Sequence, residues 1–380
     1  MKQTSTRLLL AVCLMVLAGS LGAQSVTLPP SGGNQKAEVS QWIGLVKLTL
    51  TYSSPDVTDP QGNSRRGKIW GQLVPYGMAP NSFGTAREIP WRAGANENTT
   101  FTCTHDVLVE GQELKAGTYG LHLIPRENEA WTLIFSNNHT AWGSFFYDPA
   151  EDALRVEVQP EDAPYTEWLT YEFIDRQPSA AVCALRWEEK QIPFKIEVPN
   201  LNELYVENMQ RELQSTAGFS WQGYQSAAAF CLTNNTHLEQ GLEWAEAAVS
   251  APFIGQKNFQ TLGTRGLLQY ALGEDEQGQA SLMAALKYEA QPFQYYQVGS
   301  SLIGMEKNDA ALAYFTGMAE KLPGHWMSYA GLAAGNRVTG NTKEALKYYK
   351  KALEGAPPNW KPSLEQRIAS LENAPSAKNR

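Results

Sequence analysis

The sequence predicts a two-domain chain in which an all-β sandwich at residues 38–198 precedes an all-α solenoid of helical hairpins at residues 201–372. Short alternating segments, bounded by Gly, Pro, Asn and Asp, fill the first half and are typical of a sandwich or barrel. Alanine and leucine become more frequent after residue 200, where the apolar period changes to three and four. A set of marker residues recurs at a fixed spacing near the C-terminus, as expected for a repeat array.

The N-terminal segment, residues 1–23, has the pattern of a secretory signal peptide. Lys2 and Arg7 precede an uncharged apolar run at residues 8–17, and small residues follow as far as Ala23, after which we expect cleavage. The run is shorter than the ~20 apolar residues that a spanning helix needs, which disfavours a membrane anchor. We therefore expect a mature chain without a membrane span, in the periplasm or at the cell surface, that starts with a linker at residues 24–37.

Charge and cysteine content exclude several classes of protein. The net charge is −8 and Lys and Arg do not cluster, which argues against a nucleic-acid partner, because neutralising phosphates needs concentrated positive charge. Cys103, Cys183 and Cys231 remain after cleavage, too few and too sparse for a disulfide framework. Either Cys103 and Cys183 form one bridge, or these thiols are buried and free. The Cys and His spacing of a metal site is absent, so no metal or cofactor is predicted.

The β half reads as a series of short strands without any βαβ pattern, which disfavours a parallel fold. The predicted strands cover residues 45–52, 99–109, 117–124, 131–135, 153–159, 167–174, 180–188 and 194–198. A hairpin-like turn at residues 110–112 joins the second and third of them.

The helical half contains an internal repeat. Its three marker positions, an alanine, an aromatic residue and a proline, are Ala311, Phe315 and Pro323, and the same order and spacing recur at Ala345, Tyr349 and Pro357. This spacing resembles that of the tetratricopeptide repeat, in which small residues let two antiparallel helices approach and the proline ends the second helix. About four hairpins at residues 201–357, a capping helix at 361–371 and a disordered tail at 373–380 are expected. The alternative is a plain helical bundle.

Several strings in the β half resemble a bacterial family known as domain of unknown function 2911. They lie at residues 52–55, 69–77, 91–97, 116–119, 131–135, 141–143 and 186–188. The resemblance implies an exported protein of the Bacteroidetes type, in which helical repeats sometimes follow the domain, and it implies no activity. This chain differs from the family pattern by an insertion at residues 78–90, which is predicted to be a surface loop beside Trp91 and Arg92.

A ligand site is the first candidate for function in the β half. Trp91 would stack on a sugar ring while Arg92 binds a carboxylate or a pair of hydroxyls, with Asn96 and Glu97 on the same glycine-containing loop. The alternative is a structural lock in which Arg92 and Glu97 pair with each other or with the backbone.

Two histidines form a second candidate. If His105 and His122 lie on neighbouring strands, they could join Glu97 or Asp106 in a metal or acid–base site. The alternative is that these histidines are core residues with satisfied hydrogen bonds. No catalytic residue is predicted, because the sequence has neither a nucleophile elbow nor a phosphate-binding glycine loop.

Aromatic residues near the first helices of the hairpins predict a partner-binding surface, because these helices line the concave groove of a solenoid. The candidates are Trp221, Tyr224, Tyr295, Tyr296, Trp326 and Tyr329. We therefore expect a non-enzymatic scaffold whose repeats bind an envelope protein or peptide. The alternative is a β module that binds a glycan or another small ligand, or acts on carbohydrate.

Overall fold

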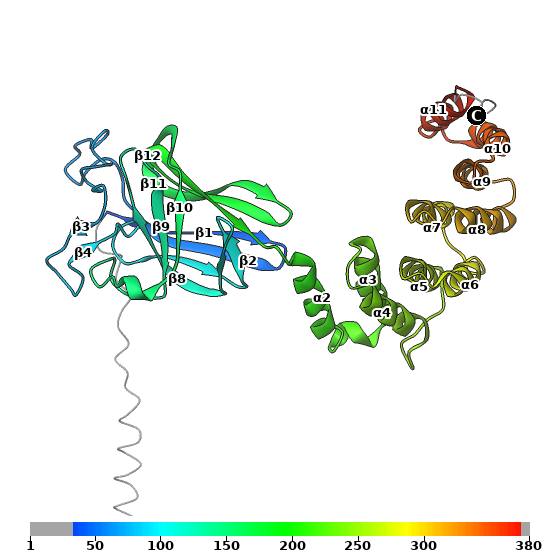
Figure 1. Ribbon diagram of the computed structural model, residues 1–380, viewed down its shortest axis with the longest axis horizontal. Coiled ribbons are helices and arrows are strands. Elements are labelled where there is room, and N and C mark those ends of the chain that lie inside the picture. The colour runs from blue at the N-terminus through cyan, green and yellow to red at the C-terminus, as the bar shows by residue number, and fades with distance from the viewer. Residues whose placement is uncertain (1–32, 374–380) are drawn as a thin grey trace, which may run out of the picture. The chain divides into compact units, whose positions relative to one another are not determined.

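The computed structural model describes residues 33–373, which divide into two compact units, the first ending at Pro199 and the second beginning at Asn200 (Figure 1). The predicted signal peptide and residues 374–380 of the predicted tail lie outside the described residues. No helix between residues 33 and 373 is long and apolar enough to cross a membrane.

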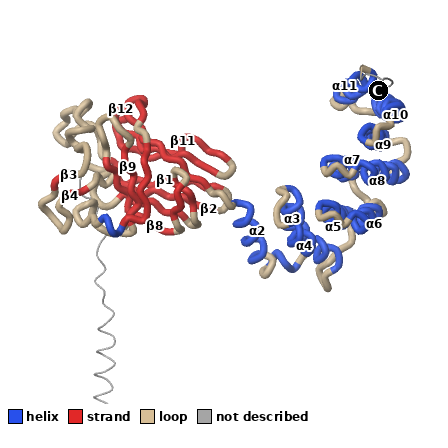
Figure 2. Tube along the Cα trace, in the orientation of Figure 1, coloured by secondary structure: helices blue, strands red, loops and turns tan. Residues whose placement is uncertain are grey.

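The first unit is built from strands (Figure 2). They are β1 (Gln35–Ile43), β2 (Val46–Ser54), β3 (Ala79–Pro80), β4 (Glu88–Ile89), β5 (Thr99–Cys103), β6 (Val107–Val109), β7 (Gln112–Leu114), β8 (Gly117–Ile124), β9 (Trp131–Ser136), β10 (Asp152–Val158), β11 (Glu161–Gln177) and β12 (Ala180–Glu197), with one short 3-10 helix at Pro149–Glu151. One sheet has the order β1-β2-β5-β8-β9-β10 and a second has the order β11-β12-β6-β7. All the pairings within these two sheets are antiparallel.

The core of this unit lies between the two sheets. Burial alternates along β2 and β5, so that one face of each strand is apolar and enclosed. The Phe135 ring on β9 contacts Phe101 of its own sheet at 5.3 Å between ring centroids and Phe194 of the other sheet at 6.4 Å. The prediction of an all-β sandwich is therefore confirmed.

The structure corrects three local predictions. β1 begins at Gln35, inside the predicted linker, because it is an edge strand whose exposed polar residues hide its pattern. The strand predicted at 99–109 is two strands, β5 and β6, which belong to different sheets. The strands predicted at 180–188 and 194–198 are one strand, β12.

The structure also tests the predicted turn at residues 110–112 and the predicted surface loop at residues 78–90. Glu110 and Gly111 both have positive φ, 49° and 77°, as a two-residue hairpin requires, so a turn forms where it was predicted, but it joins β6 to β7 and not to the strand at 117–124. The insertion at residues 78–90 contains the β3–β4 pair, and Met78 and Ala86 pack against Ile124 on the outer face of the six-stranded sheet. It is therefore more than a surface loop.

The second unit is helical throughout. Its helices are α2 (Leu201–Glu212), α3 (Trp221–Thr233), α4 (Leu238–Ser250), α5 (Phe259–Ala271), α6 (Asp275–Ala285), α7 (Pro292–Gly304), α8 (Asn308–Lys321), α9 (Trp326–Val338), α10 (Thr342–Gly355) and α11 (Lys361–Glu372), with a 3-10 turn at Thr216–Phe219. The helices α3 to α10 form four hairpins, and the first helices of neighbouring hairpins contact one another. The starts of α5, α7 and α9, at positions 259, 292 and 326, are evenly spaced and follow the period of a tetratricopeptide repeat. The predicted tetratricopeptide-like solenoid is confirmed over the bundle alternative.

The repeat positions found in the sequence do what the repeat requires. Ala311, Phe315, Ala345 and Tyr349 are fully buried between helices. α8 ends two residues before Pro323, and α10 likewise ends two residues before a proline. Packing between hairpins therefore follows the spacing of the repeat.

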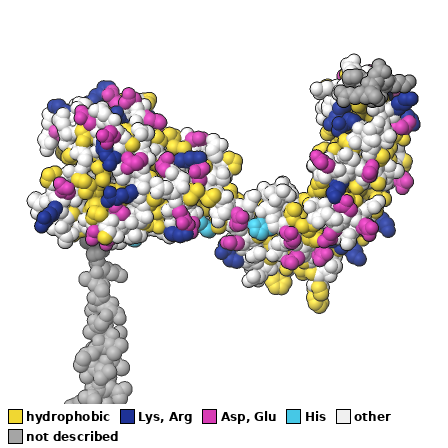
Figure 3. All heavy atoms as spheres, viewed as in Figure 1, with side chains coloured by type: hydrophobic (Ala, Val, Ile, Leu, Met, Phe, Trp, Pro, Cys, Tyr) yellow, Lys and Arg dark blue, Asp and Glu magenta, His cyan; other side chains and the backbone are white. Residues whose placement is uncertain are grey.

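Acidic and basic side chains are interspersed over the visible face of both units, without one concentrated basic area (Figure 3).

Candidate functional site

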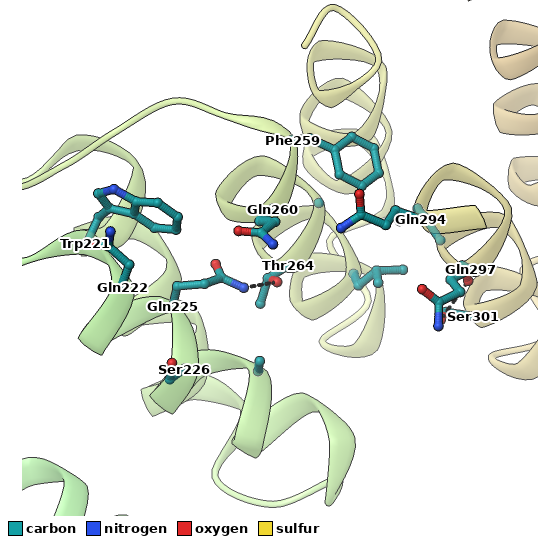
Figure 4. Close-up of a pocket in the computed structure, with 14 residues that line it drawn as sticks. Trp221, Gln222, Gln225, Ser226, Phe259, Gln260, Thr264, Gln294, Gln297 and Ser301 are labelled. Carbon is teal, nitrogen blue, oxygen red and sulfur yellow. Dashed lines mark hydrogen bonds between the residues drawn. The ribbon is translucent and has the colours of Figure 1, made fainter. Parts of the chain in front are cut away.

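A cavity of about 390 Å³ lies along the first helices of three successive hairpins, α3, α5 and α7 (Figure 4). Five glutamines contribute to its lining, and we call it the glutamine groove. They are Gln222, Gln225, Gln260, Gln294 and Gln297. Trp221 supplies aromatic surface at the start of α3, whereas Phe259 at the start of α5 lies mostly in the core beneath the groove, with 6% of its surface exposed.

The glutamines occupy equivalent positions because of the repeat. Each of the three first helices has an aromatic residue followed by glutamine at its N-terminal end, namely Trp221-Gln222, Phe259-Gln260 and Phe293-Gln294. The interval from the first pair to the second is longer than the interval from the second to the third, because the α4–α5 connection is longer. The repeat therefore places one amide per hairpin along the same face.

Most of these amides have hydrogen-bonding capacity to spare. The side chains of Gln222, Gln260 and Gln297 are exposed, and they have no hydrogen-bond partner among residues 33–373. Gln294 Oε1 accepts from the backbone N–H of Gln291 at 2.9 Å, which leaves its Nε2 free to donate. Gln225 Nε2 donates to Thr264 Oγ1 at 2.6 Å, and this bond ties α3 to α5.

The groove carries no charge among its lining residues. Its polar groups are amides and the hydroxyls of Ser226, Thr264 and Ser301, each of which can donate or accept. Such a surface suits the peptide backbone, which offers one donor and one acceptor per residue, better than it suits a charged group.

The aromatic residues predicted to bind a partner are only partly in this groove. Trp221 lines it, while Tyr224 is half-buried against the core around Cys231. Tyr295 has no exposed surface and donates from its hydroxyl to Tyr288 O at 2.6 Å, so its predicted role is wrong. It is a core residue because its ring packs edge-on against Phe259 of α5, at 4.7 Å between ring centroids, inside the apolar core of the array.

The other three aromatic candidates lie further along the array. Tyr296 and Trp326 are half-buried beside Trp360, and Tyr329 stacks on Tyr348 at 6.3 Å between ring centroids. They do not line the glutamine groove. Sequence reasoning based on aromatic residues missed the glutamines, although the recurring aromatic–glutamine pair was a signal that could have found them.

In the β unit, the loop that follows the bridge between Trp91 and Leu123 carries the predicted ligand residues. Arg92 Nη1 donates to Asn96 O at 2.6 Å, and the guanidinium lies over the Phe145 ring at 4.8 Å from its centroid. Glu97 does not pair with Arg92. It contacts Lys36 Nζ at 3.1 Å and Ser53 Oγ at 3.2 Å, and its own backbone N–H and Lys36 lower the pKa of the carboxyl.

The two candidate histidines are not brought together. His122 follows Leu121, which pairs with Thr99 at one end of the β5–β8 ladder, whereas His105 lies beyond Cys103 at the other end. His122 is buried and its Nδ1 shares a hydrogen bond of 2.9 Å with Ser144 Oγ. His105 instead forms a hydrogen bond with the Thr104 hydroxyl. Within residues 33–373, no group of three potential metal ligands occurs. The joint histidine site is therefore wrong.

The three cysteines of the described chain are free and buried, so of the two alternatives the structure has the buried free thiols and not the Cys103–Cys183 bridge. Cys103 lies on β5 and Cys183 on β12, in different sheets. Burial raises the pKa of Cys103 to about 11, which keeps this thiol protonated and unreactive at neutral pH.

Comparison with known proteins identifies the first unit. Residues 34–196 match the model of a family described as "Protein of unknown function (DUF2911)". No protein of curated function matches the chain.

Several solved structures of repeat proteins resemble less than half of this chain. MamA is 16% identical, with a TM-score of 0.31, covering 44% of this chain and 91% of that chain. YrrB, a TPR protein with an unusual peptide-binding site, is 18% identical with a TM-score of 0.30, covering 44% and 84%. A tetratricopeptide repeat protein from Parabacteroides merdae is 18% identical with a TM-score of 0.32, covering 45% and 65%. From the family match and the geometry of its own helices, the chain carries a domain of the DUF2911 family at residues 34–196, followed by tetratricopeptide-like repeats.

Proposed function

We propose that the chain is an exported, non-enzymatic scaffold of the cell envelope whose repeats bind an extended, uncharged segment of a partner protein in the glutamine groove. The observation that carries the proposal is the row of amides on α3, α5 and α7, in which Gln222, Gln260 and Gln297 have no hydrogen-bond partner among residues 33–373. Export is supported by the signal-like pattern of residues 1–23.

The spacing of the amides suits an extended chain. Packed helices lie roughly 8–10 Å apart, and a β-like peptide rises roughly 3.3 Å per residue. Equivalent glutamines on successive hairpins would therefore meet the backbone of about every third peptide residue. An amide can donate to a peptide carbonyl and accept from a peptide N–H, so recognition would rest on the backbone, with Trp221 contacting an apolar side chain.

The groove can be tested with peptides selected on the full chain that starts after Ala23. Replacing Gln222 and Gln260 together by alanine is expected to weaken a selected peptide about 30-fold, since each lost hydrogen bond costs about 1 kcal/mol. Fluorescence anisotropy titrations would measure the affinity. Gln277 and Gln279 are exposed on α6 and outside the groove, and their double alanine variant is the matched control, with unchanged affinity expected.

Salt distinguishes the uncharged groove from other modes of binding. Because no lining residue is charged, the affinity is expected to change by less than about threefold when salt is raised about tenfold. A steep loss of affinity with salt, or equal weakening by both double variants, would contradict the proposal.

Export can be tested by the N-terminus of the chain. When the full sequence is expressed in a Gram-negative bacterium, the protein in the periplasmic fraction is expected to begin at Gln24, because the small residues before it suit signal peptidase. Mass spectrometry of the intact protein would measure this. A chain that keeps residues 1–23 and remains with the cytoplasmic fraction would rule out the export part of the proposal, and a variant with Ala23→Phe should accumulate uncleaved.

A further inference from the structure

A second cavity, of about 450 Å³, lies in the β unit and is independent of the glutamine groove. Its wall comes from four parts of the chain that are distant in the sequence: the residues just before β1, the segment after β2, the loop that carries Trp91 and Arg92, and Trp187 on β12. A volume of this size is within the range of small-ligand sites.

One side of this cavity is a cluster of tryptophans. The rings of Trp91 and Trp187 are stacked, with 6.0 Å between centroids and 18° between planes, and Trp70 meets both edge-on at 5.6 and 5.9 Å. Trp91 and Trp187 line the cavity. The packing fixes the orientation of Trp91, which is half-buried, so a flat apolar surface is held ready for the face of a ring.

Arg92 also lines this cavity, and its charge is not balanced. It forms no ion pair with a carboxylate between residues 33 and 373, and it donates a single hydrogen bond, to Asn96 O. The guanidinium is nevertheless held in place, by the Phe145 ring and by Gly143, where an added β-carbon would lie 2.3 Å from Nη1. A half-buried cation with several unused donors is unfavourable unless an anion joins it.

The other two charged residues in the cavity wall, Arg65 and Asp56, lie close to each other, in contrast to Arg92. Arg65 donates to the backbone oxygens of Val57 and Asp56, and it lies 3.7 Å from the Asp56 carboxylate. Its charge is therefore balanced by a carboxylate, unlike that of Arg92. Asp56 disfavours a second anionic group in the cavity but can accept from hydroxyls, as can Asn34, which is hydrogen-bonded to Asn96 at 3.1 Å.

We propose that this cavity binds an acidic sugar, with the carboxylate of a uronic acid on Arg92, the ring face on Trp91 and the hydroxyls on Asp56 and Asn34. Among the described residues that line the cavity, Arg92 is the cation without a carboxylate partner, so a single carboxylate would match it, and guanidinium groups bind carboxylates through two parallel hydrogen bonds. Aromatic stacking against a sugar ring explains why the tryptophan wall stands beside the polar groups.

The test is a calorimetric titration of the chain that starts after Ala23 with D-glucuronate and with D-galacturonate, compared with D-glucose and with benzoate. Saturable binding of at least one uronate, about tenfold or more tighter than glucose and benzoate, is expected. Arg92→Lys keeps the charge but not the paired geometry, and we expect it to weaken uronate binding about tenfold. Arg66→Gln is the control, because Arg66 is exposed, pairs with Glu189 and does not line the cavity.

Melting temperatures separate binding from a purely structural role for Arg92. If Arg92→Lys melts at the temperature of the unchanged protein yet binds uronate less well, the proposal stands. If Arg92→Lys does not fold, Asn34→Ala, a change at the edge of the cavity, is expected to weaken uronate binding by about threefold or more. Three outcomes would overturn the proposal of a uronate site. They are no saturable uronate binding up to about 50 mM, binding of glucose or benzoate as tight as that of uronate, and uronate binding by the folded variants as tight as that of the unchanged protein.

Discussion

Replacing Phe315 by alanine is expected to lower the free energy of unfolding of the repeat array by about 3–5 kcal/mol. The ring is fully buried on α8 and lies in a slot between two glycines of neighbouring first helices, Gly299 on α7 and Gly331 on α9. A β-carbon at either glycine would come within 2.4 Å of the ring, so the slot fits the aromatic side chain closely. Alanine would leave a cavity where three helices meet.

Urea unfolding followed by circular dichroism at the helical band would measure the loss as a lower midpoint of the helical transition. Phe253→Ala is the matched control, because Phe253 belongs to the same unit but is fully exposed, and no change is expected there. Gly331→Ala should also destabilise the array, by about 1–3 kcal/mol, because the added methyl overfills the slot. If Phe315→Ala unfolds at the same urea concentration as Phe253→Ala, Phe315 does not hold the hairpins together.

The regular spacing of the repeat made this part of the fold predictable. Ala311 and Phe315, together with Ala345 and Tyr349, were found in the sequence as a recurring pair, and all four are core residues. Repetition is informative because each hairpin buries its apolar face on the next, so the same positions carry the same packing role. The glutamines escaped notice because polar residues are expected at exposed positions.

Alternation alone was less informative in the β unit. Phe101, Cys103, Val107 and Val109 are all buried, so the period of two keeps its phase across the partly exposed His105 while the chain passes from one sheet to the other. Both sheets face the same core, and a strand that crosses between them keeps the same parity of burial. The pattern therefore predicts which residues are inside but not which sheet they join, and this is why His105 and His122 were placed too close together.

Acid is expected to destabilise the β unit through His122. The imidazole lies on the outer face of β8, where it is 2% exposed, hydrogen-bonded to Ser144 and in edge contact with Tyr147 at 5.4 Å. Burial, and to a smaller extent the positive charge of Arg92, lower the pKa of His122 to about 4. In the unfolded chain the pKa would be near its ordinary value of about 6.5.

The sign of the effect follows from which state takes up the proton first. Above pH 6.5 the ring is neutral in both states and stability does not depend on it. As the pH falls from 6.5 towards 4, the unfolded chain becomes protonated while the folded ring stays neutral, so the unfolded state is favoured. The free energy of unfolding should fall by about 2 kcal/mol between pH 7 and pH 5, and by about 3 kcal/mol once the pH is below 4.

Urea unfolding at a series of pH values, followed by tryptophan fluorescence, would measure this loss, because Trp131 and Trp187 of the β unit are buried. His122→Gln removes the titrating ring and keeps a hydrogen-bonding group for Ser144, so its stability should fall by less than about 0.5 kcal/mol between pH 7 and pH 5 even if it is lower at both. The control is His105→Asn, which changes a partly exposed histidine of the same unit and should keep the full loss. Equal acid sensitivity of the His122→Gln variant and the unchanged protein would assign the effect to carboxylates instead. A loss that disappears only in His122→Gln would show that the ring is held neutral, which is also the state that lets Arg92 carry its charge so close by.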